Sequence, residues 1–284
     1  MKLGSEEHKT LFCRNFIESH LTYEPEQLSW PQLDDITLSR LRAIPFWRQA
    51  LDTERRAGAM VAAFVETVDD PLIRQAIALQ GQEESRHARL IQTLVKQYHI
   101  DLPTPSPIAL PLHISADFAA FGFGECLDSF FAFGLFSLAG QADFFPDSLF
   151  TLFDPILSEE ARHIVFFVNW FTYEQINHGW GLPPLRAART LWHYSRAIRK
   201  LIAAFGGADT GGARFAATDA GLFAKNLTAE KFLTLCLKEN QRRMRQFDPN
   251  LLQPKLLPQL AAVSLRILQL MPRRRPRQTI EGVS

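Results

Sequence analysis

The sequence predicts an all-α protein, and three observations lead to that prediction. Long segments carry apolar residues at helical spacing, with prolines or short polar turns between them. No alternating strand pattern of useful length appears in the 284 residues. Two similar strings, 83–87 and 159–163, each place a glutamate three residues before a histidine, and residues at that spacing share a face on a helix.

Four central helices are expected, at 46–67, 72–98, 117–139 and 146–177. The turn Asp69-Asp70-Pro71 joins the first two, because proline is favoured at the start of a helix. Four prolines in 100–116 predict an extended connector between the second and third helices. Pro155 predicts a kink or a break within the fourth helix.

Further helices are expected on both sides of this core. Residues 6–43 predict short helices, and later helices are placed from Pro183-Pro184 to Phe205, at 228–246 and at 254–271. The glycine-rich stretch 206–221 is expected to be a loop, and it lacks the Gly-Lys-Ser/Thr ending of a phosphate-binding loop. We therefore expect a single domain over 1–284, with a bundle core at 46–178, additional packing helices at 183–271 and a basic tail at 272–284.

The charge, the cysteine content and the apolar runs of the sequence indicate which classes of protein the chain can belong to. The chain has 31 basic and 30 acidic residues, so no bulk positive charge would attract nucleic acid. Its three cysteines form no C-x-x-C pair, which favours a reduced, cytoplasmic protein, and the N-terminus has no secretory signal pattern. No run of about 18 uninterrupted apolar residues is present. The apolar segment 118–138, which carries Glu125 and Asp128, is expected to be a buried helix.

The repeated strings predict a metal site. Glu84 with His87, and Glu160 with His163, each place a carboxylate and an imidazole on one helix face, where both groups can bind a divalent cation. Oxygen and nitrogen ligands suit iron, manganese or zinc. Each histidine continues an apolar face, and burial of unpaired carboxylates on such faces would be costly without a metal.

The number of residues between each predicted turn and the nearby glutamates identifies two further candidate ligands. Glu54 lies 15 residues before Asp69 and Glu84 lies 13 after Pro71, so the two share a height in an antiparallel hairpin. Glu125 matches Glu160 in the same way, with Asp128 one turn on as a competing ligand. The predicted ligands are Glu54, Glu84, His87, Glu125, Glu160 and His163.

Two other interpretations stay open at this point. The ligands could be displaced by one residue, to Glu83 and Glu159. Alternatively, both strings could be surface ion pairs, in which Arg86 and Arg162 bond to Glu83 and Glu159 of their own helices.

A glutamate followed by Glu-x-x-His, twice over, resembles the ferritin-like di-iron carboxylate proteins, including the oxidases and oxygenases similar to the ribonucleotide reductase small subunit. The resemblance covers about 46–178 and implies a four-helix bundle with a long crossover between helices two and three. It also implies two bound iron ions, or one manganese and one iron, together with O2 and an external electron donor.

The residues around the ligands suggest which reaction the site performs. Gly58 and Gly122 are expected to leave space beside the metals, and phenylalanines are dense over 118–153. We expect an apolar pocket for a small organic substrate, and hence a di-iron oxidase or oxygenase. Gln80, one turn before Glu84, is a candidate to support that ligand, whereas Tyr98 is about three turns from His87 and is poorly placed for a radical. Arylamine N-oxygenases carry an extra histidine where this chain has Ile156.

Two alternative functions remain. One is iron handling or peroxide reduction by a ferritin-like protein. The other is a non-catalytic role, since the apolar helix at 254–271 runs into the basic stretch 273–277 and could contact a partner, a second copy in a homodimer, or an anionic membrane.

Overall fold

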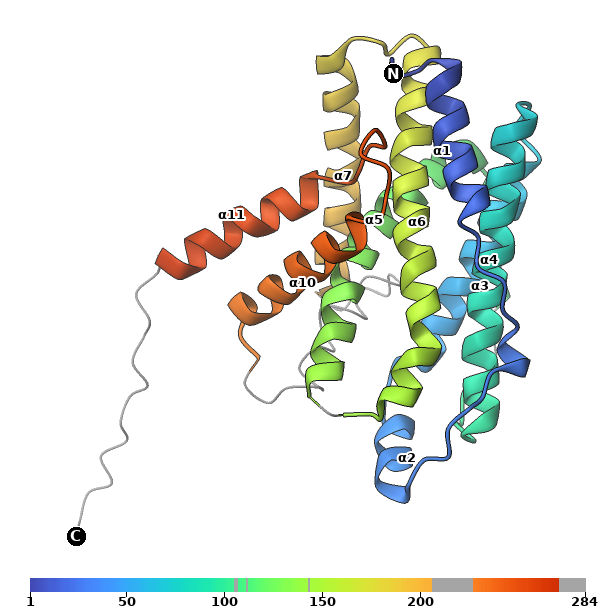
Figure 1. The fold of residues 1–284 in the computed structure, drawn as a ribbon, viewed down its shortest axis with the longest axis vertical. Coiled ribbons are helices and arrows are strands. Elements are labelled where there is room, and N and C mark those ends of the chain that lie inside the picture. Colours follow the sequence, from blue (N-terminus) through green and yellow to red (C-terminus); the bar gives the residue numbers. More distant parts are fainter. Residues whose placement is uncertain (105–106, 111, 143, 206–226, 271–284) are drawn as a thin grey trace.

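The computed structural model describes residues 1–104, 107–110, 112–142, 144–205 and 227–270, and the regular secondary structure among these residues is helical, with no strand. The helices, in chain order, are α1 (Glu6–Glu18), the short 3-10 helix η1 (Pro25–Gln27), α2 (Asp35–Arg42), α3 (Trp47–Val65), α4 (Pro71–Gln97), α5 (Ile114–Gln141), α6 (Asp147–Asn177), α7 (Pro183–Phe205), α10 (Ala229–Met244) and α11 (Leu256–Leu270). Figure 1 shows α3 to α6 as long, roughly parallel or antiparallel rods.

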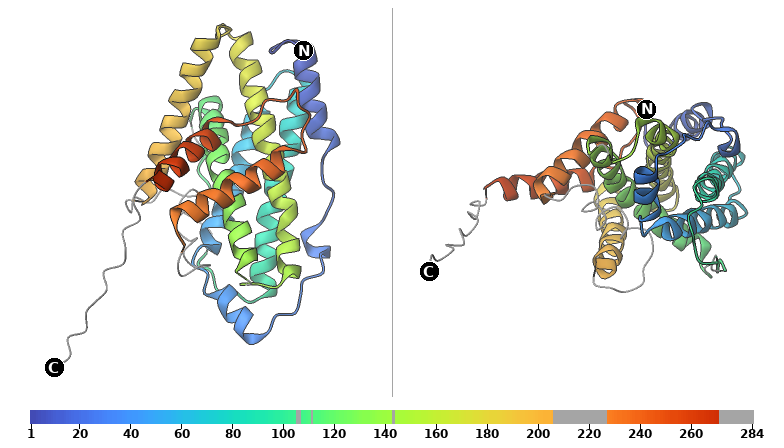
Figure 2. Two further views of the ribbon diagram at one scale, coloured as in Figure 1. Left: turned by 60° about the vertical axis from the view of Figure 1, so that its left-hand side comes forward. Right: turned by 90° about the horizontal axis from the view of Figure 1, so that it is seen from below.

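Four helices surround one interior. Helix α3 packs against α4 and α5, and α6 packs against α5 and α4. Helix α1 covers the groove between α4 and α6, while α7 and α10 cover α5. The two further views in Figure 2 show α11 extending sideways from this body. The predicted all-α architecture is confirmed for the described residues.

The first hairpin forms as its sequence dictates. Asp70 caps α4, because its Oδ1 accepts hydrogen bonds from the backbone N–H groups of Leu72 (2.9 Å) and Ile73 (3.0 Å). Pro71 takes the first helical position, where its missing N–H costs nothing. Lys9 Nζ lies 2.6 Å from Asp70 Oδ2, which ties α1 to this turn. The hairpin therefore begins and ends within about two residues of the predicted bounds.

The second hairpin contains the predicted fourth helix. Helix α6 continues from Asp147 to Asn177 with Pro155 inside it, so the alternative of a break at Pro155 is wrong and the alternative of a kink stays a prediction. A proline inside a helix removes one backbone hydrogen bond, but burial on both sides of it holds the helix together. Leu152, Phe153 and Leu157 are all buried.

Helix α5 is the apolar centre of the fold. By length and composition alone it could cross a membrane, yet 61% of its most apolar window is buried within the protein. It also carries Glu125 and Asp128, so we interpret it as the predicted buried core helix. The expected loop at 206–221 and the basic tail at 272–284 lie outside the described residues.

Candidate metal centre

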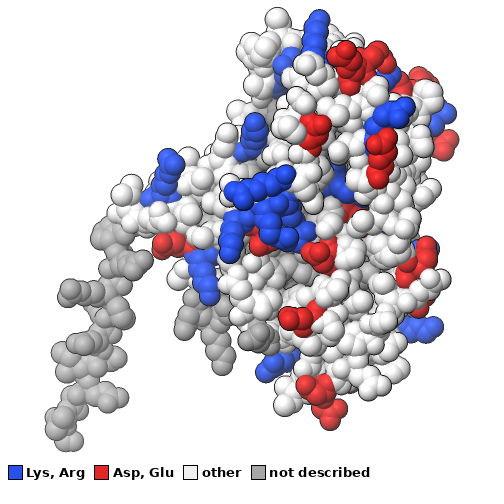
Figure 3. Space-filling model, viewed as in Figure 1, with Lys and Arg blue, Asp and Glu red and all other residues white. Residues whose placement is uncertain are grey.

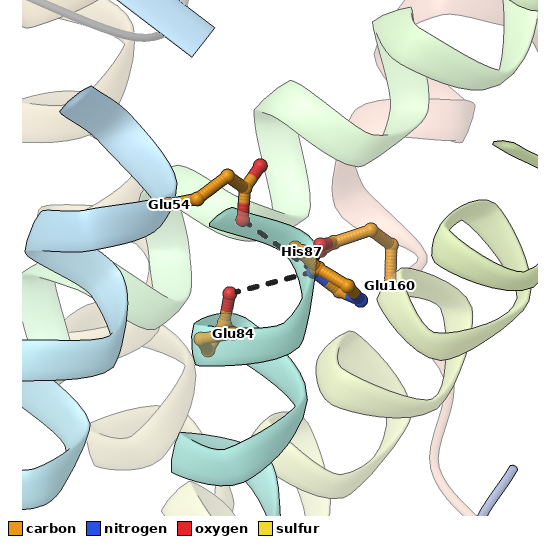
Figure 4. A group of neighbouring side chains, drawn as sticks. All are labelled: Glu54, Glu84, His87 and Glu160. Carbon is orange, nitrogen blue, oxygen red and sulfur yellow. Dashed lines mark ion pairs between the residues drawn. The ribbon is translucent and has the colours of Figure 1, made fainter. Parts of the chain in front are cut away.

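A cluster of carboxylates and histidines lies between α3, α4 and α6. Glu54, Glu84, His87 and Glu160 each offer one ligand atom, and these four atoms all lie within 4.8 Å of one another. Figure 4 shows their side chains converging on a common point from three helices. Groups so disposed can hold a metal ion, as the sequence predicted for these four residues.

His87 faces three carboxylates through one ring nitrogen. Its Nδ1 lies 3.4 Å from Glu54 Oε2, 3.8 Å from Glu84 Oε2 and 3.3 Å from Glu160 Oε1. His87 is fully buried. All three carboxylates therefore lie at the Nδ1 edge of the imidazole ring.

His163 contacts two of the same carboxylates from the other side of the cluster. Its Nδ1 lies 3.2 Å from Glu84 Oε1 and 3.7 Å from Glu160 Oε2, and its ring centroid is 5.7 Å from that of His87. Glu84 and Glu160 thus turn one oxygen toward each histidine. Glu84 and Glu160 therefore lie between the two histidines, whereas Glu54 lies beside His87.

Glu125 and its competitor Asp128 both approach the cluster from α5. Burial, together with repulsion from Glu160 and Glu84, raises the pKa of Glu125 well above 4.5, and a hydrogen bond with Glu160 adds to the rise. Burial followed by repulsion from Glu160 and Glu54 raises the pKa of Asp128 to about 7. Both carboxyl groups are thus repelled by Glu160, Glu125 also by Glu84 and Asp128 also by Glu54. Both residues lie outside the four-residue group, so the choice between them stays a prediction.

The outer nitrogen of each histidine is held by the other hairpin. His87 Nε2 lies 2.8 Å from Glu159 Oε2 of α6, and His163 Nε2 lies 2.8 Å from Glu83 Oε2 of α4. Glu83 and Glu159 are completely buried. These two glutamates lie on the far side of the rings from the cluster, and with His20 they form a second group whose ligand atoms all lie within 4.8 Å of one another, so the displaced ligand set stays an alternative.

Two arginines bind these outer glutamates crosswise. Arg162 donates from Nη1 to Glu83 Oε1 over 2.8 Å, and Arg86 donates from Nη2 to Glu159 Oε1. The surface ion-pair interpretation is wrong, since both arginines are buried and both of these short bonds cross between hairpins. Burial opposes ionisation of Glu83, but hydrogen bonds from His163 and Arg162 lower its pKa to about 2.

The N-terminal segment adds hydrogen-bond partners of the outer glutamates and of Arg162 that the sequence pattern did not predict. His20 Nδ1 lies 2.6 Å from Glu83 Oε1, and the Tyr23 hydroxyl donates to Glu159 Oε2 over 3.0 Å. Arg162 also donates to the Phe16 carbonyl over 2.6 Å. No local pattern marks these residues, because their partners lie 63 to 146 positions away in the sequence.

The geometry fits a bound cation. Each Nε2 donates its proton to an outer carboxylate that cannot donate in return, so Nδ1 of a neutral ring carries a lone pair. That lone pair faces carboxylate oxygens, which are also acceptors, and neither His87 Nδ1 nor His163 Nδ1 has a hydrogen-bond partner. Glu160 Oε2 is likewise buried without one. A cation, or additional protons, must occupy this position for the acceptors to be satisfied.

In the absence of metal, protons would take that role. Burial disfavours the charged form of both histidines, but the surrounding carboxylates raise the pKa of His87 and His163 well above 6.5. Burial raises the pKa of Glu54 to about 7, although contact with His87 opposes this shift. Metal binding must therefore displace protons from the cluster.

Two predictions about the surroundings have different outcomes. Gln80 donates to Glu84 Oε1 over 3.3 Å, as proposed for a supporting residue. The space expected beside Gly122 is absent, because a Cβ there would lie 2.1 Å from Phe167 Cε2. At Gly58 it would lie 3.0 Å from Ser85 Oγ. Both glycines serve close approach of helices instead.

An apolar cavity does exist, but two turns away from the ligands. It has a volume of about 60 Å³ and lies between α2, α3, α5 and α6. Its lining includes Trp47, Phe136, Phe150 and Phe153, in part the predicted phenylalanine cluster. Tyr98, the radical candidate, instead donates its hydroxyl to the Pro31 carbonyl over 2.9 Å.

Comparison of the chain with protein-family models, with curated proteins and with solved structures finds no match.

Proposed function

We propose that the cluster binds two divalent metal ions and that the protein is a ferritin-like di-iron oxidase or oxygenase. The observation that carries this proposal is the position of Glu84 and Glu160, each of which turns one oxygen toward each histidine. A single cation would use one oxygen of each carboxylate and leave the second histidine unsatisfied. Two cations would use all four oxygens and both Nδ1 atoms.

Charge supports the same number of ions. With neutral histidines, Glu54, Glu84, Glu125 and Glu160 carry four negative charges when ionised, which two divalent cations balance. The outer glutamates do not enter this sum, because Arg86 and Arg162 already neutralise them. Glu54 and His87 would serve one ion, and Glu125 and His163 the other. This is the ligand scheme of ferritin-like bundles.

The protein's own residues would orient and seal the site. Glu159 and Glu83 fix both imidazole rings with Nδ1 inward, and Gln80 orients Glu84. Burial of His87, His163 and Glu84 keeps water away from the cluster. Iron bound there would supply the electrons and Lewis acidity needed to reduce O2, with an external donor restoring the electrons.

The apolar cavity supports a small hydrocarbon-like substrate. Trp47 and Phe153 line it, and each lies seven residues before a proposed ligand, Glu54 and Glu160. Seven residues make about two helical turns, so both aromatic side chains share the ligands' face at about 10 Å along the helix. Because the cavity is well below the ~150 Å³ that accommodates benzene, a larger substrate requires the phenylalanine rings to move.

The experiment compares loaded protein with matched variants. Protein loaded anaerobically with Fe²⁺ should consume O2 with a reductant and oxidise a small apolar substrate. Glu84→Ala and His163→Ala should lose both metal and activity. Phe153→Trp should retain the metal but change the preferred substrate size, because the indole fills the cavity. Unchanged activity in the Glu84→Ala and His163→Ala variants would contradict the proposal.

Iron handling or peroxide reduction is the second candidate. Phe167 fills the space beside Gly122, and a filled interior suits a site that acts only on iron, O2 or peroxide. This candidate predicts oxidation of bound Fe²⁺ by peroxide or O2 with no organic substrate consumed and no effect of Phe153→Trp.

A further inference from the structure

Helix α11 exposes an apolar face to solvent. Leu257 and Ala261 point inward and are buried, with α10 and α5 as the helices that α11 contacts. On the outward side, large apolar residues are 44% to 85% exposed; they are Leu260, Val263, Ile267 and Leu270. The helix therefore has two apolar sides, and the fold of the described residues uses only one.

The outward residues form one continuous stripe. Their spacing of three, four and three residues places them within about 80° of arc around the helix, at 100° per residue. Figures 1 and 2 show α11 projecting from the bundle, and the exposed fractions of the four residues place the stripe on a solvent-facing side of the helix. An exposed stripe of this kind on a projecting helix marks a contact surface.

Basic residues are frequent on α11, on the neighbouring helix α10 and in the sequence that follows α11. Arg266 and Lys255 are exposed on or beside α11, and the sequence places Arg273, Arg274, Arg275 and Arg277 directly after the helix. On the adjoining helix α10, Lys238, Arg242 and Arg245 are also exposed. Figure 3 shows positive side chains gathered over α10 on this face of the molecule. No acidic residue occurs from 249 to 280.

We propose that α11 docks the protein onto an anionic lipid bilayer. The helix would lie in the plane of the interface, with its outward leucines, valine and isoleucine among the acyl chains. Lys255 and Arg266 would contact anionic headgroups, and the four arginines that follow the helix in the sequence would add to the attraction, as clusters of four to eight basic residues beside an amphipathic helix do.

Charge favours a membrane over a second copy of the chain. Pairing two α11 stripes would leave the basic residues of both copies without an anionic partner, and in a parallel pair the two positively charged helix ends would also repel each other. Residues 271–284 contain few large apolar side chains, so this segment is poorly suited to cover the stripe. An anionic surface satisfies both the apolar stripe and the basic residues.

The test measures binding of the full-length protein to vesicles. We expect co-sedimentation with vesicles of 70% phosphatidylcholine and 30% phosphatidylserine, weaker binding at high salt, and little binding to pure phosphatidylcholine. The double variant Leu260→Gln/Ile267→Gln should bind about tenfold more weakly or worse, since it removes half of the buried apolar anchor. Leu112→Gln, which changes a leucine that is 95% exposed in the connector before α5, should bind like the unmodified protein.

A second variant separates the charge from the apolar stripe. Replacement of Arg273, Arg274 and Arg275 by glutamine should remove most of the salt-sensitive part of binding. Metal content and helicity should be unchanged in every variant. Absence of binding to anionic vesicles, or equal binding to neutral ones, would overturn the proposal. So would a dimer in lipid-free solution that the Leu260→Gln/Ile267→Gln variant dissociates, because a second copy would then be the occupant.

Discussion

Substitution of Glu83 by glutamine tests the crosswise support of the metal centre. Glu83 is completely buried and binds His163, Arg162 and His20 at 2.8, 2.8 and 2.6 Å. Glutamine preserves the shape but removes the negative charge. Its single acceptor oxygen cannot serve both Arg162 and His163, and Arg162, which is also bonded to Phe16 and Ser19, loses its counterion.

The expected cost follows from the pKa. Glu83 has its pKa lowered from 4.5 to about 2, so its ionised form stabilises the metal-free fold by about 3 kcal/mol above pH 5. Loss of one partner from a buried ion pair typically costs about 3–5 kcal/mol, which agrees with this value. We also expect metal affinity to fall about 10- to 100-fold, because His163 loses the group that orients it.

The measurements are urea unfolding of the metal-free protein and competition for metal with a chelator. Glu24→Gln, which breaks the exposed ion pair with Arg89, is the matched control and should cost under about 1 kcal/mol. Glu83 has a lowered folded-state pKa, so its contribution should disappear as pH falls from about 5 toward 2. The difference in stability between unmodified and Glu83→Gln protein should shrink over that window. Equal costs for Glu83→Gln and Glu24→Gln, or a difference independent of pH, would refute the reasoning.

Three further substitutions test the packing around the site. Gly122→Ala should destabilise the fold by about 1–3 kcal/mol, because its methyl group meets the Phe167 ring, whereas Gly124→Ala, with open space, should be neutral or stabilising in thermal unfolding. Asn169→Ala should cost about 2–4 kcal/mol in urea unfolding, since this completely buried amide joins His8 to the Leu252 backbone by three hydrogen bonds. Asp70→Ala should cost about 1–2 kcal/mol by the same assay through loss of the α4 cap, and Asp70→Asn should cost less.

Each substitution has an outcome that would contradict its explanation. A stable Gly122→Ala variant would mean that Phe167 can move aside. An Asn169→Ala variant as stable as the unmodified protein would show that its hydrogen bonds add nothing to the connection of the two terminal segments. Equal losses for Asp70→Ala and Asp70→Asn would indicate that the Lys9 ion pair, rather than the cap, supports the turn.

Local spacing was sufficient to predict the centre of the cluster. The three-residue interval within each string fixes Glu84 beside His87, and the turn at Pro71 fixes Glu54 at the same height. Both relations depend on helix geometry alone, which a sequence pattern reveals. The bounds of the four central helices were predictable to within about three residues for the same reason, and α6 runs through Pro155 without a break.

Long-range relations could not be predicted in this way. The crosswise bonds of Arg86 and Arg162 join residues 73 and 79 positions apart, and they depend on how the hairpins pack. His20 and Tyr23 reach the outer glutamates only because the N-terminal segment crosses the bundle. The glycine at 122 suggested open space, but Phe167 fills it, because a missing side chain permits close packing as readily as a cavity.

Metal content is the most direct test of the central claim that the cluster binds two ions. Protein reconstituted with excess Fe²⁺ under argon and then desalted should retain two iron ions per chain by mass spectrometry of the dissolved metal. Glu84→Ala and Glu160→Ala should each lower this number toward zero, because these carboxylates face both histidines. A content of one ion or none in the unmodified protein, or of two ions in both variants, would contradict the account.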